Sequence, residues 1–109
     1  MPNLFPFLIL LALGSGLTAQ AEGVSSELGR TIYDGYCASC HAPSNIMVSS
    51  PKLGAPKDWE PRLAQGFDVV LRHAIDGFNA MPPRGTCQWC SDEEIAAAIR
   101  YMSGLDEEG

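Results

Sequence analysis

The stretch "YCASCH", residues 36–41, decides how the rest of this 109-residue sequence is interpreted. Cys37 and Cys40 are three positions apart, so on a helix their side chains project from the same side of one turn. Two sulfurs placed in this way can form thioethers with the two vinyl groups of one porphyrin, and His41 can supply an imidazole nitrogen to its iron. The stretch therefore predicts one haem c, attached covalently through Cys37 and Cys40, with His41 as an axial ligand.

A second cysteine pair, in "TCQWCS" at residues 86–91, leaves other interpretations open. Four thiolates from the two pairs would satisfy tetrahedral zinc. However, residues 41–86 separate the pairs, which far exceeds the ~15 to 20 residues of the familiar zinc spacing. The first pair could also be a redox-active dithiol, but such a pair usually accompanies a βαβ pattern, and the sequence shows none. We favour haem attachment over both.

The first 21 residues have the layout of a secretory signal peptide. An apolar block at residues 4–13 is followed by small residues and by Ala19-Gln20-Ala21, although no Lys or Arg precedes the block. About ten apolar residues cannot cross a hydrocarbon core that requires ~20 in a helix, so we expect no stable membrane insertion. Residues 22–109 are predicted to form one exported, periplasmic domain that ends in a short acidic tail.

Charge excludes one large class of partners. The chain has 7 Lys and Arg against 13 Asp and Glu, a formal net charge of −6. Nucleic acid binding needs a basic footprint, so we expect no nucleic acid partner. An acidic surface suits a soluble exported protein that meets neutral or basic partners.

Helical periodicity appears in three segments, and no alternating strand pattern is visible. Helices are predicted at residues 26–36, 68–76 and 91–103, the second ending at Gly77 and the third beginning with a Ser91/Glu94 capping box. A shorter helix is predicted to begin near Asp58. The sequence therefore predicts an all-α domain with long loops at residues 42–57 and 78–90, and loops of such length usually have a functional role.

A second axial ligand is needed if the iron is to carry electrons rather than bind gas. Met81, in "NAMPPRG", is the best candidate because the two prolines that follow it restrict the backbone at low entropic cost. Met47 follows the attachment site too closely to reach the opposite face of the ring. Met102 falls on the apolar stripe of the last helix, and His73 lies off the apolar face of its helix, where we expect it to be solvent-exposed.

At this point the sequence resembles a known family, the class I c-type cytochromes, and within them the cytochrome c5 group. The resemblance spans residues 22–109 and is densest in "WEPRLAQGFDVVLRHAIDGFNAMPPRGTCQWCSDEEIAAAIRYM", residues 59–102. It implies a small cytochrome c fold of three main helices and a short extra helix around one covalent haem. It also implies a one-electron carrier, not an enzyme, that exchanges electrons with redox proteins such as a membrane or periplasmic oxidoreductase or a terminal oxidase.

The resemblance also implies roles for individual residues. Cys37 and Cys40 match the thioether cysteines, while His41 and Met81 match the two axial ligands. Pro51 matches a loop proline whose carbonyl accepts a hydrogen bond from the histidine's other ring nitrogen.

Further matches concern the haem surroundings and the helix packing. Trp59 and Arg62 match residues near the haem propionates, and Cys87 and Cys90 match a disulfide. Three residues match the family's contact at the crossing of the first and last helices: Gly29, Tyr33 and Tyr101. One departure is "HAPSNIMVSSPKLG", which lacks the family's glycines and is longer by about two residues, so the haem edge beside it is expected to differ.

Two alternatives to a freely diffusing carrier stay open. The protein could be a haem subunit or dedicated donor of one enzyme, for which Phe78 or Trp89 could form an exposed apolar patch. It could also be a small haem enzyme or gas sensor, which requires an open sixth position. Met81 argues against the latter.

Overall fold

The computed structural model describes residues 26–105, so the predicted signal segment and the acidic tail lie outside the described residues. The chain first forms one continuous helical run over residues 26–41, which contains the π-helical stretch η1 (Tyr33–Cys37) and the short α2 (Ala38–His41). Three further helices follow: α3 (Pro56–Leu63), α4 (Phe67–Asp76) and α5 (Asp92–Ser103). Residues 26–105 contain no strand, which confirms the all-α prediction.

The helix boundaries agree with the predictions except at two places. The first helix continues past Tyr36 through the cysteine motif to His41. The short helix begins earlier than predicted, because Ala55 is its N-cap and Pro56 occupies the first turn, where a missing N–H costs nothing. Asp58 is therefore not the cap; its carboxylate instead accepts the backbone N–H of Lys52 at 3.1 Å.

Capping sets the ends of α4 and α5. Gly77 is the C-cap of α4, and its N–H donates to the His73 carbonyl. At the start of α5 the predicted capping box is present: the Ser91 hydroxyl accepts the Glu94 N–H at 3.1 Å, and the Glu94 carboxylate accepts the Ser91 N–H at 2.7 Å. The two bonds satisfy backbone donors that would otherwise lack partners at the helix start.

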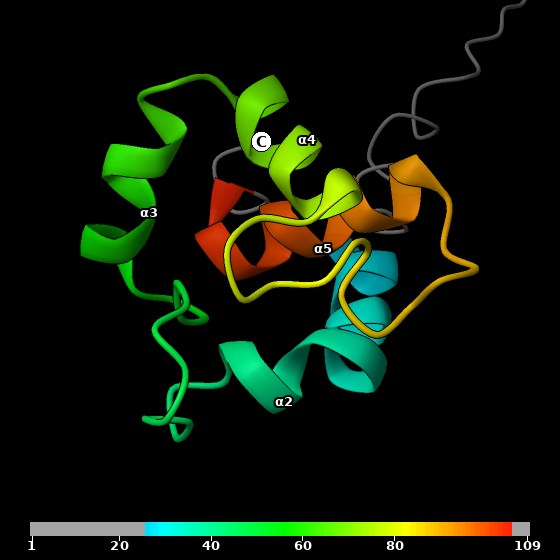
Figure 1. Ribbon diagram of the computed structural model, residues 1–109, viewed down its shortest axis with the longest axis horizontal. Coiled ribbons are helices and arrows are strands. Elements are labelled where there is room, and N and C mark those ends of the chain that lie inside the picture. The colour runs from blue at the N-terminus through cyan, green and yellow to red at the C-terminus, as the bar shows by residue number, and fades with distance from the viewer. Residues whose placement is uncertain (1–25, 106–109) are drawn as a thin grey trace, which may run out of the picture.

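Helix α5 forms the centre of the molecule, between α4 and the first helix (Figure 1). Almost all of its faces are covered, and six of its residues are buried: Ile95, Ala96, Ala97, Ala98, Ile99 and Met102. Small alanines allow neighbouring helices to approach closely on several sides. Arg100, an exposed residue of this helix, lies 4.5 Å from the centroid of the Phe67 ring and so joins α5 to α4.

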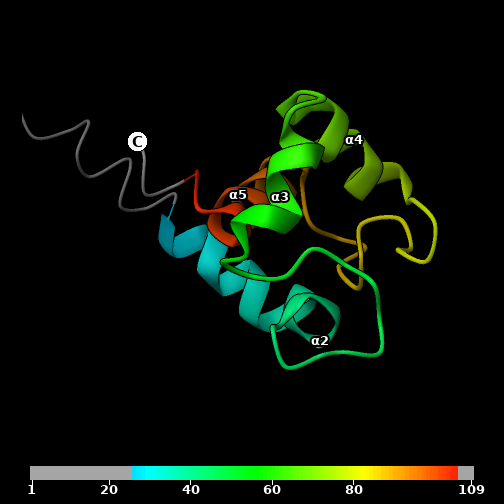
Figure 2. The same cartoon turned by 90° about the vertical axis from the view of Figure 1, so that its left-hand side faces the viewer.

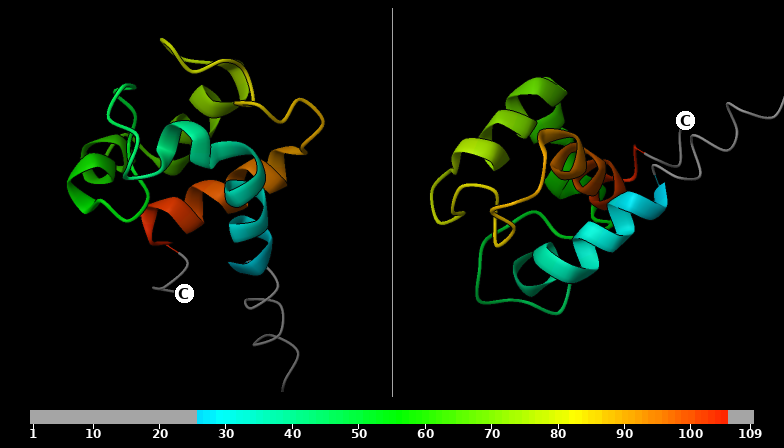
Figure 3. Two further views of the ribbon diagram at one scale, coloured as in Figure 1. Left: turned by 90° about the horizontal axis from the view of Figure 1, so that it is seen from below. Right: turned by 90° about the vertical axis from the view of Figure 1, so that its right-hand side faces the viewer.

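The first helical run crosses α5 at a glycine contact (Figure 3). A Cβ at Gly29 would overlap the carbonyl of Ala97 and would lie 3.0 Å from the Cβ of Tyr101. The rings of Tyr33 and Tyr101 lie beside this contact with centroids 5.5 Å apart. These residues form the predicted crossing contact, and glycine is required there because any side chain would push the helices apart.

Two long loops complete the fold and lie on the same side of α5. Residues 42–55 run from α2 to α3 and are tied to the end of α5 by a hydrogen bond from Gly54 N–H to the Met102 carbonyl, 2.9 Å long. Residues 77–91 run from α4 to α5, and Figure 2 shows both loops facing each other beyond the ends of the helices. Residues of both loops and of the helices line the cavity described below.

Among residues 26–105, no helix has the length and apolar character needed to cross a membrane.

Candidate functional site

One cavity of about 550 Å³ brings together the residues that the sequence singles out. Its lining includes Cys37, Cys40 and His41 from the first helical run and Met81 from the loop between α4 and α5, and α5 contributes apolar side chains. A volume in this range is typical of sites for small molecules and cofactors. The cavity is therefore the candidate haem site.

His41 is prepared to act as a metal ligand. Its side chain is 8% exposed, and its Nδ1 lies 2.7 Å from the carbonyl oxygen of Pro51. Because a carbonyl can only accept, Nδ1 carries the proton and Nε2 keeps its lone pair. Burial lowers the pKa of His41; the Pro51 hydrogen bond opposes this shift, and the positive charges of Lys52 and Arg62 add to it. The neutral imidazole, which is the form that binds metal, is thereby favoured.

The two cysteines beside it have the geometry that the motif requires. Cys37 and Cys40 are free thiols, partly buried, and both line the cavity. Burial raises the pKa of the Cys37 thiol to about 11. Being three residues apart at the end of one helical run, both face the same space.

The loop that follows His41 is held by a lysine that the sequence did not single out. The ammonium group of Lys52 donates to the carbonyls of Cys40 and Val48 and to the hydroxyl of Ser50, at 3.1, 2.8 and 2.7 Å. These bonds fix the path of the segment that departs from the family pattern. No sequence signal predicts that Lys52 holds this loop, because a lysine next to a proline is usually a surface residue.

Met81 is presented by a short hairpin. Phe78 and Met81 exchange two backbone hydrogen bonds, each 2.9 Å long, across a turn in which Asn79 has a positive φ of 53°. The N–H of Arg84 then donates to the Ala74 carbonyl at 2.8 Å, which fastens the hairpin to α4. Met81 is partly buried and lines the cavity.

The other methionines and the second histidine lie as follows. Met102 is buried in the core at 4% exposure, as the sequence indicates, although it also lines the cavity, and Met47 is 89% exposed. His73 differs from the prediction, because it is partly buried and lines the cavity. Its ring stacks on that of Phe78 with centroids 4.0 Å apart, an arrangement that helical periodicity cannot reveal because Phe78 belongs to the following loop.

Trp59 and Arg62 both line the cavity, and each already has a protein partner. The indole N–H of Trp59 donates to the Lys52 carbonyl at 2.8 Å, and its side chain is 3% exposed. One N–H of the Arg62 guanidinium donates to the Asp58 carbonyl at 2.6 Å, and its other donors are available to an anionic group.

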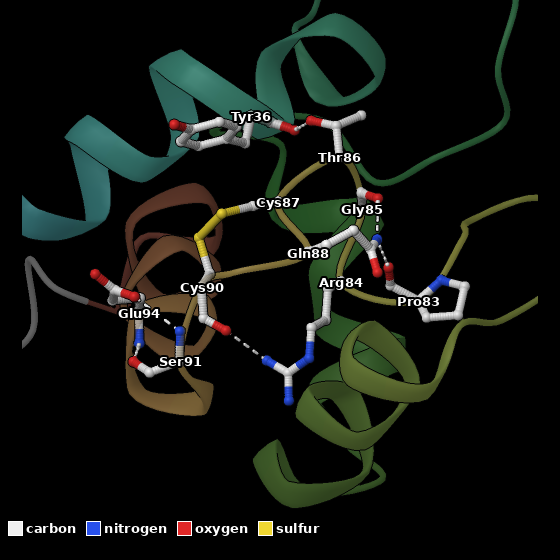
Figure 4. The surroundings of a disulfide bond; sticks show 10 residues. All are labelled: Tyr36, Pro83, Arg84, Gly85, Thr86, Cys87, Gln88, Cys90, Ser91 and Glu94. Carbon is white, nitrogen blue, oxygen red and sulfur yellow. Dashed lines mark hydrogen bonds between the residues drawn. A yellow bond between two sulfur atoms is a disulfide. The ribbon is translucent and has the colours of Figure 1, made fainter.

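The second cysteine pair does not share a metal site with the first. Cys87 and Cys90 form a disulfide with 1% and 4% exposure (Figure 4). Within residues 26–105, no cluster of three or more His, Cys, Asp or Glu side chains could hold a metal ion. The zinc interpretation is therefore contradicted for the described residues, and the disulfide implied by the family resemblance is present.

The chemistry of the lining fits a haem. The cavity is mostly apolar, and apart from histidine its charged lining residues are Arg62 and Arg84, with no carboxylate among them. This is notable in a chain with a net charge of −6. A large apolar ring with anionic substituents would find both apolar contact and positive charge here.

Comparisons with known proteins identify the family. A family model described as "Cytochrome C oxidase, cbb3-type, subunit III" matches residues 25–102. Cytochrome c5 of Azotobacter vinelandii is 40% identical over 76% of this chain and 100% of its own length. Cytochrome c-555 of Chlorobaculum tepidum is 30% identical over 81% of this chain and 83% of its own.

A solved structure is also similar. It is titled "Crystal structure of electron transfer complex of nitrite reductase with cytochrome c", and one of its chains matches with a TM-score of 0.62 and 38% identity. The match covers 72% of this chain and 94% of that one. From its fold, its site and these relatives, the protein is a member of the class I c-type cytochromes, in the cytochrome c5 family, and binds one covalent haem c.

Proposed function

We propose that this protein is a soluble, exported, monohaem one-electron carrier in which His41 and Met81 are the axial ligands and Cys37 and Cys40 form the thioethers. The observation that carries the proposal is that these four side chains, from two segments far apart in the sequence, line one cavity. When bound, the haem supplies a one-electron Fe(III)/Fe(II) couple.

The residues around His41 would hold the cofactor in one orientation. The Pro51 carbonyl keeps His41 in the tautomer that presents Nε2 and prevents the ring from rotating. Lys52 and Trp59 fix the loop that contains Pro51, since both bond to it or to its neighbours. Little rearrangement of these groups is then needed when charge changes at the site, which favours fast electron exchange.

Met81 would supply its sulfur as the second ligand, and the apolar lining of α4 and α5 would exclude water. A methionine ligand raises the potential of a histidine-ligated haem. Buried side chains of α4 and α5, including Val70, Ile95 and Ile99, line the cavity and keep it apolar. Arg62 would neutralise an anionic substituent, because it lines the cavity and has donors free, whereas the Arg84 guanidinium is already paired with Asp92.

The proposed partners are redox proteins, and no side chain is assigned a bond-making role. A similar chain was solved in an electron transfer complex with a nitrite reductase, which supports an oxidoreductase of the periplasm or membrane, or a terminal oxidase, as partner class. Residues 1–21 support export to the periplasm by the signal-peptide pattern.

The decisive experiment is the visible spectrum of the protein made with c-type haem maturation machinery. We expect a low-spin reduced spectrum, haem that resists acid extraction, and the weak long-wavelength sulfur-to-iron band in the oxidised form. A high-spin spectrum would show that Met81 is not the ligand and would favour the haem enzyme or gas sensor instead. Protein without covalent haem would end the proposal.

A dedicated donor or subunit of one enzyme is a second candidate function. The observation in its favour is the exposure of four large apolar side chains: Ile46 at 87%, Met47 at 89%, Phe78 at 50% and Trp89 at 65%. Exposed apolar groups of this size often mark protein contacts. Purification of the native protein at low salt discriminates the two, because a dedicated subunit copurifies with one partner in fixed stoichiometry and a diffusing carrier does not.

A further inference from the structure

The loop of residues 77–91, here called the methionine loop, is fastened firmly to one half of the molecule. The backbone of Arg84 bonds to Ala74 of α4. The guanidinium of Arg84 donates to the Cys90 carbonyl at 2.7 Å and pairs with Asp92 of α5 at 2.6 Å. These bonds hold the loop to α4 and α5, but none of them reaches the helix that carries the cysteine motif.

A single hydrogen bond makes that connection among the described residues. The hydroxyl of Thr86 donates to the carbonyl of Tyr36 at 2.7 Å, across 50 positions of sequence (Figure 4). Tyr36 directly precedes Cys37. Within residues 26–105, it is the only hydrogen bond between the methionine loop and residues 26–41.

The same place is close to the end of the Met81 side chain. A Cβ on Gly85 would lie 3.7 Å from the Met81 methyl carbon and 3.9 Å from the Tyr36 carbonyl oxygen. Gly85 precedes Thr86, so the methionine tip, the loop backbone and the Tyr36 carbonyl meet within a few ångströms. The ring of Trp89 packs edge-on against that of Tyr36, with centroids 5.2 Å apart, and closes the contact on the other side.

The backbone around Thr86 is already fixed, so its hydroxyl has little freedom to lose. Gly85 N–H donates to the Pro82 carbonyl at 2.9 Å, and Cys87 N–H donates to the Arg84 carbonyl at 3.0 Å. The Cys87–Cys90 disulfide follows immediately and lies in the core. A hydrogen bond made by such a preorganised group keeps more of its free energy than one made by a mobile side chain.

We propose that Thr86 is a positioning residue for Met81: its hydroxyl sets the distance between the methionine loop and the haem-attachment helix and so keeps the thioether at the sixth coordination position. This inference rests on the proposed His41/Met81 ligation. Thr86 itself lines the cavity, and its proposed effect on Met81 is transmitted through the loop. Loss of the hydroxyl leaves the loop bound to α4 and α5 but removes the one hydrogen bond that, within residues 26–105, joins it to the helical run of residues 26–41.

The test compares carbon monoxide binding to the reduced holoprotein in the parent, Thr86→Val and Thr86→Ser. A typical hydrogen bond is worth enough to change an equilibrium roughly 2- to 12-fold, so we expect Thr86→Val to bind carbon monoxide that much more tightly. It should also weaken the sulfur-to-iron band of the oxidised form. Thr86→Ser, which keeps the hydroxyl, should resemble the parent.

Gln88→Ala is the matched control. Gln88 also makes an exposed side chain to backbone bond of 2.7 Å, to Pro83, but this bond stays inside the methionine loop. We expect it to leave carbon monoxide binding unchanged. Equal effects of Thr86→Val and Gln88→Ala, or a lower unfolding temperature of Thr86→Val with unchanged binding and band, would overturn the inference.

Two further outcomes are separable. If Thr86→Val fails to load haem, Thr86→Ala provides the same comparison without a branched apolar side chain beside Tyr36, and parent-like carbon monoxide binding in that variant would overturn the inference. If the parent itself lacks the sulfur-to-iron band, the proposed Met81 ligation is wrong and the role of Thr86 is wrong with it.

Discussion

Met81 and Met47 have the same side chain but lie in different environments, so Met47 is a suitable control for Met81. Met81 lines the cavity, whereas Met47 is 89% exposed on the loop after the cysteine motif. We expect Met81→Ala to raise the carbon monoxide affinity of the reduced protein by at least about tenfold, because no internal ligand then competes. Met47→Ala should match the parent. Equal affinities in all three proteins, measured by titration, would contradict the ligand assignment.

His41 predicts how stability changes with pH. Burial lowers its pKa, and iron bound at Nε2 would lower its proton affinity in the same direction, so the unfolded chain takes up a proton at a higher pH than the folded protein does. Its contribution to stability is therefore complete above the ordinary imidazole value of 6.5 and is lost as pH falls below that value toward the lowered one. Urea unfolding at pH 7.5, 6.5 and 5.5 should show decreasing stability. His73→Gln should keep this trend, and stability that is constant or rises on acidification would refute it.

At the scale of the elements, the crossing of the first helix and α5 depends on one missing side chain. Gly29→Ala would place a Cβ against the Ala97 carbonyl, and we expect a loss of about 1–3 kcal/mol from overpacking. Gly35→Ala lies in the same helical run, where a Cβ meets nothing within 4 Å, so it should be neutral or stabilising by up to about 1 kcal/mol. Denaturant unfolding measures both variants, and an equal loss of stability in Gly35→Ala and Gly29→Ala would show that the contact with Ala97 is not the cause.

The capping box of α5 gives a second test at this scale. Ser91→Ala removes the acceptor for the Glu94 N–H and should cost about 1 kcal/mol. Ser91→Thr keeps an acceptor at the same place and should cost much less. Because α5 is the central helix, we expect the loss to appear as a lower midpoint of global unfolding, not as local fraying, and circular dichroism melting of the holoprotein measures it.

For the whole molecule, net charge governs association. The formal charge of −6 should attract basic redox partners over a Debye length of about 30 Å at 0.01 M salt but only about 8 Å at 0.15 M. Stopped-flow electron exchange with a small basic redox protein should therefore slow by about tenfold between these conditions. A neutral redox reagent serves as the control, and the same salt dependence for both would show that charge steering is absent.

Local signals were sufficient where the cause lies within a few residues. The spacing of Cys37, Cys40 and His41, the capping box at Ser91 and the prolines after Met81 each act through neighbouring backbone, so the sequence displays them directly. The predicted start of α3 was wrong, because Pro56 and Asp58 are both favourable at a helix N-terminus. Only the structure shows that the helix begins at Pro56 and that the Asp58 carboxylate accepts the Lys52 N–H.

Long-range pairing was beyond any local pattern. Lys52 donates hydrogen bonds to the cysteine motif and its loop, the His73 ring stacks on Phe78, and the Thr86 hydroxyl donates to the Tyr36 carbonyl. Each partner lies on another segment, so composition, periodicity and spacing carry no trace of the contact. The motif and the helix pattern thus determine which cofactor the chain binds and that its fold is helical, since both depend on local geometry. How the cavity is closed depends on packing, because hydrogen bonds between distant segments form only once the core has brought them together.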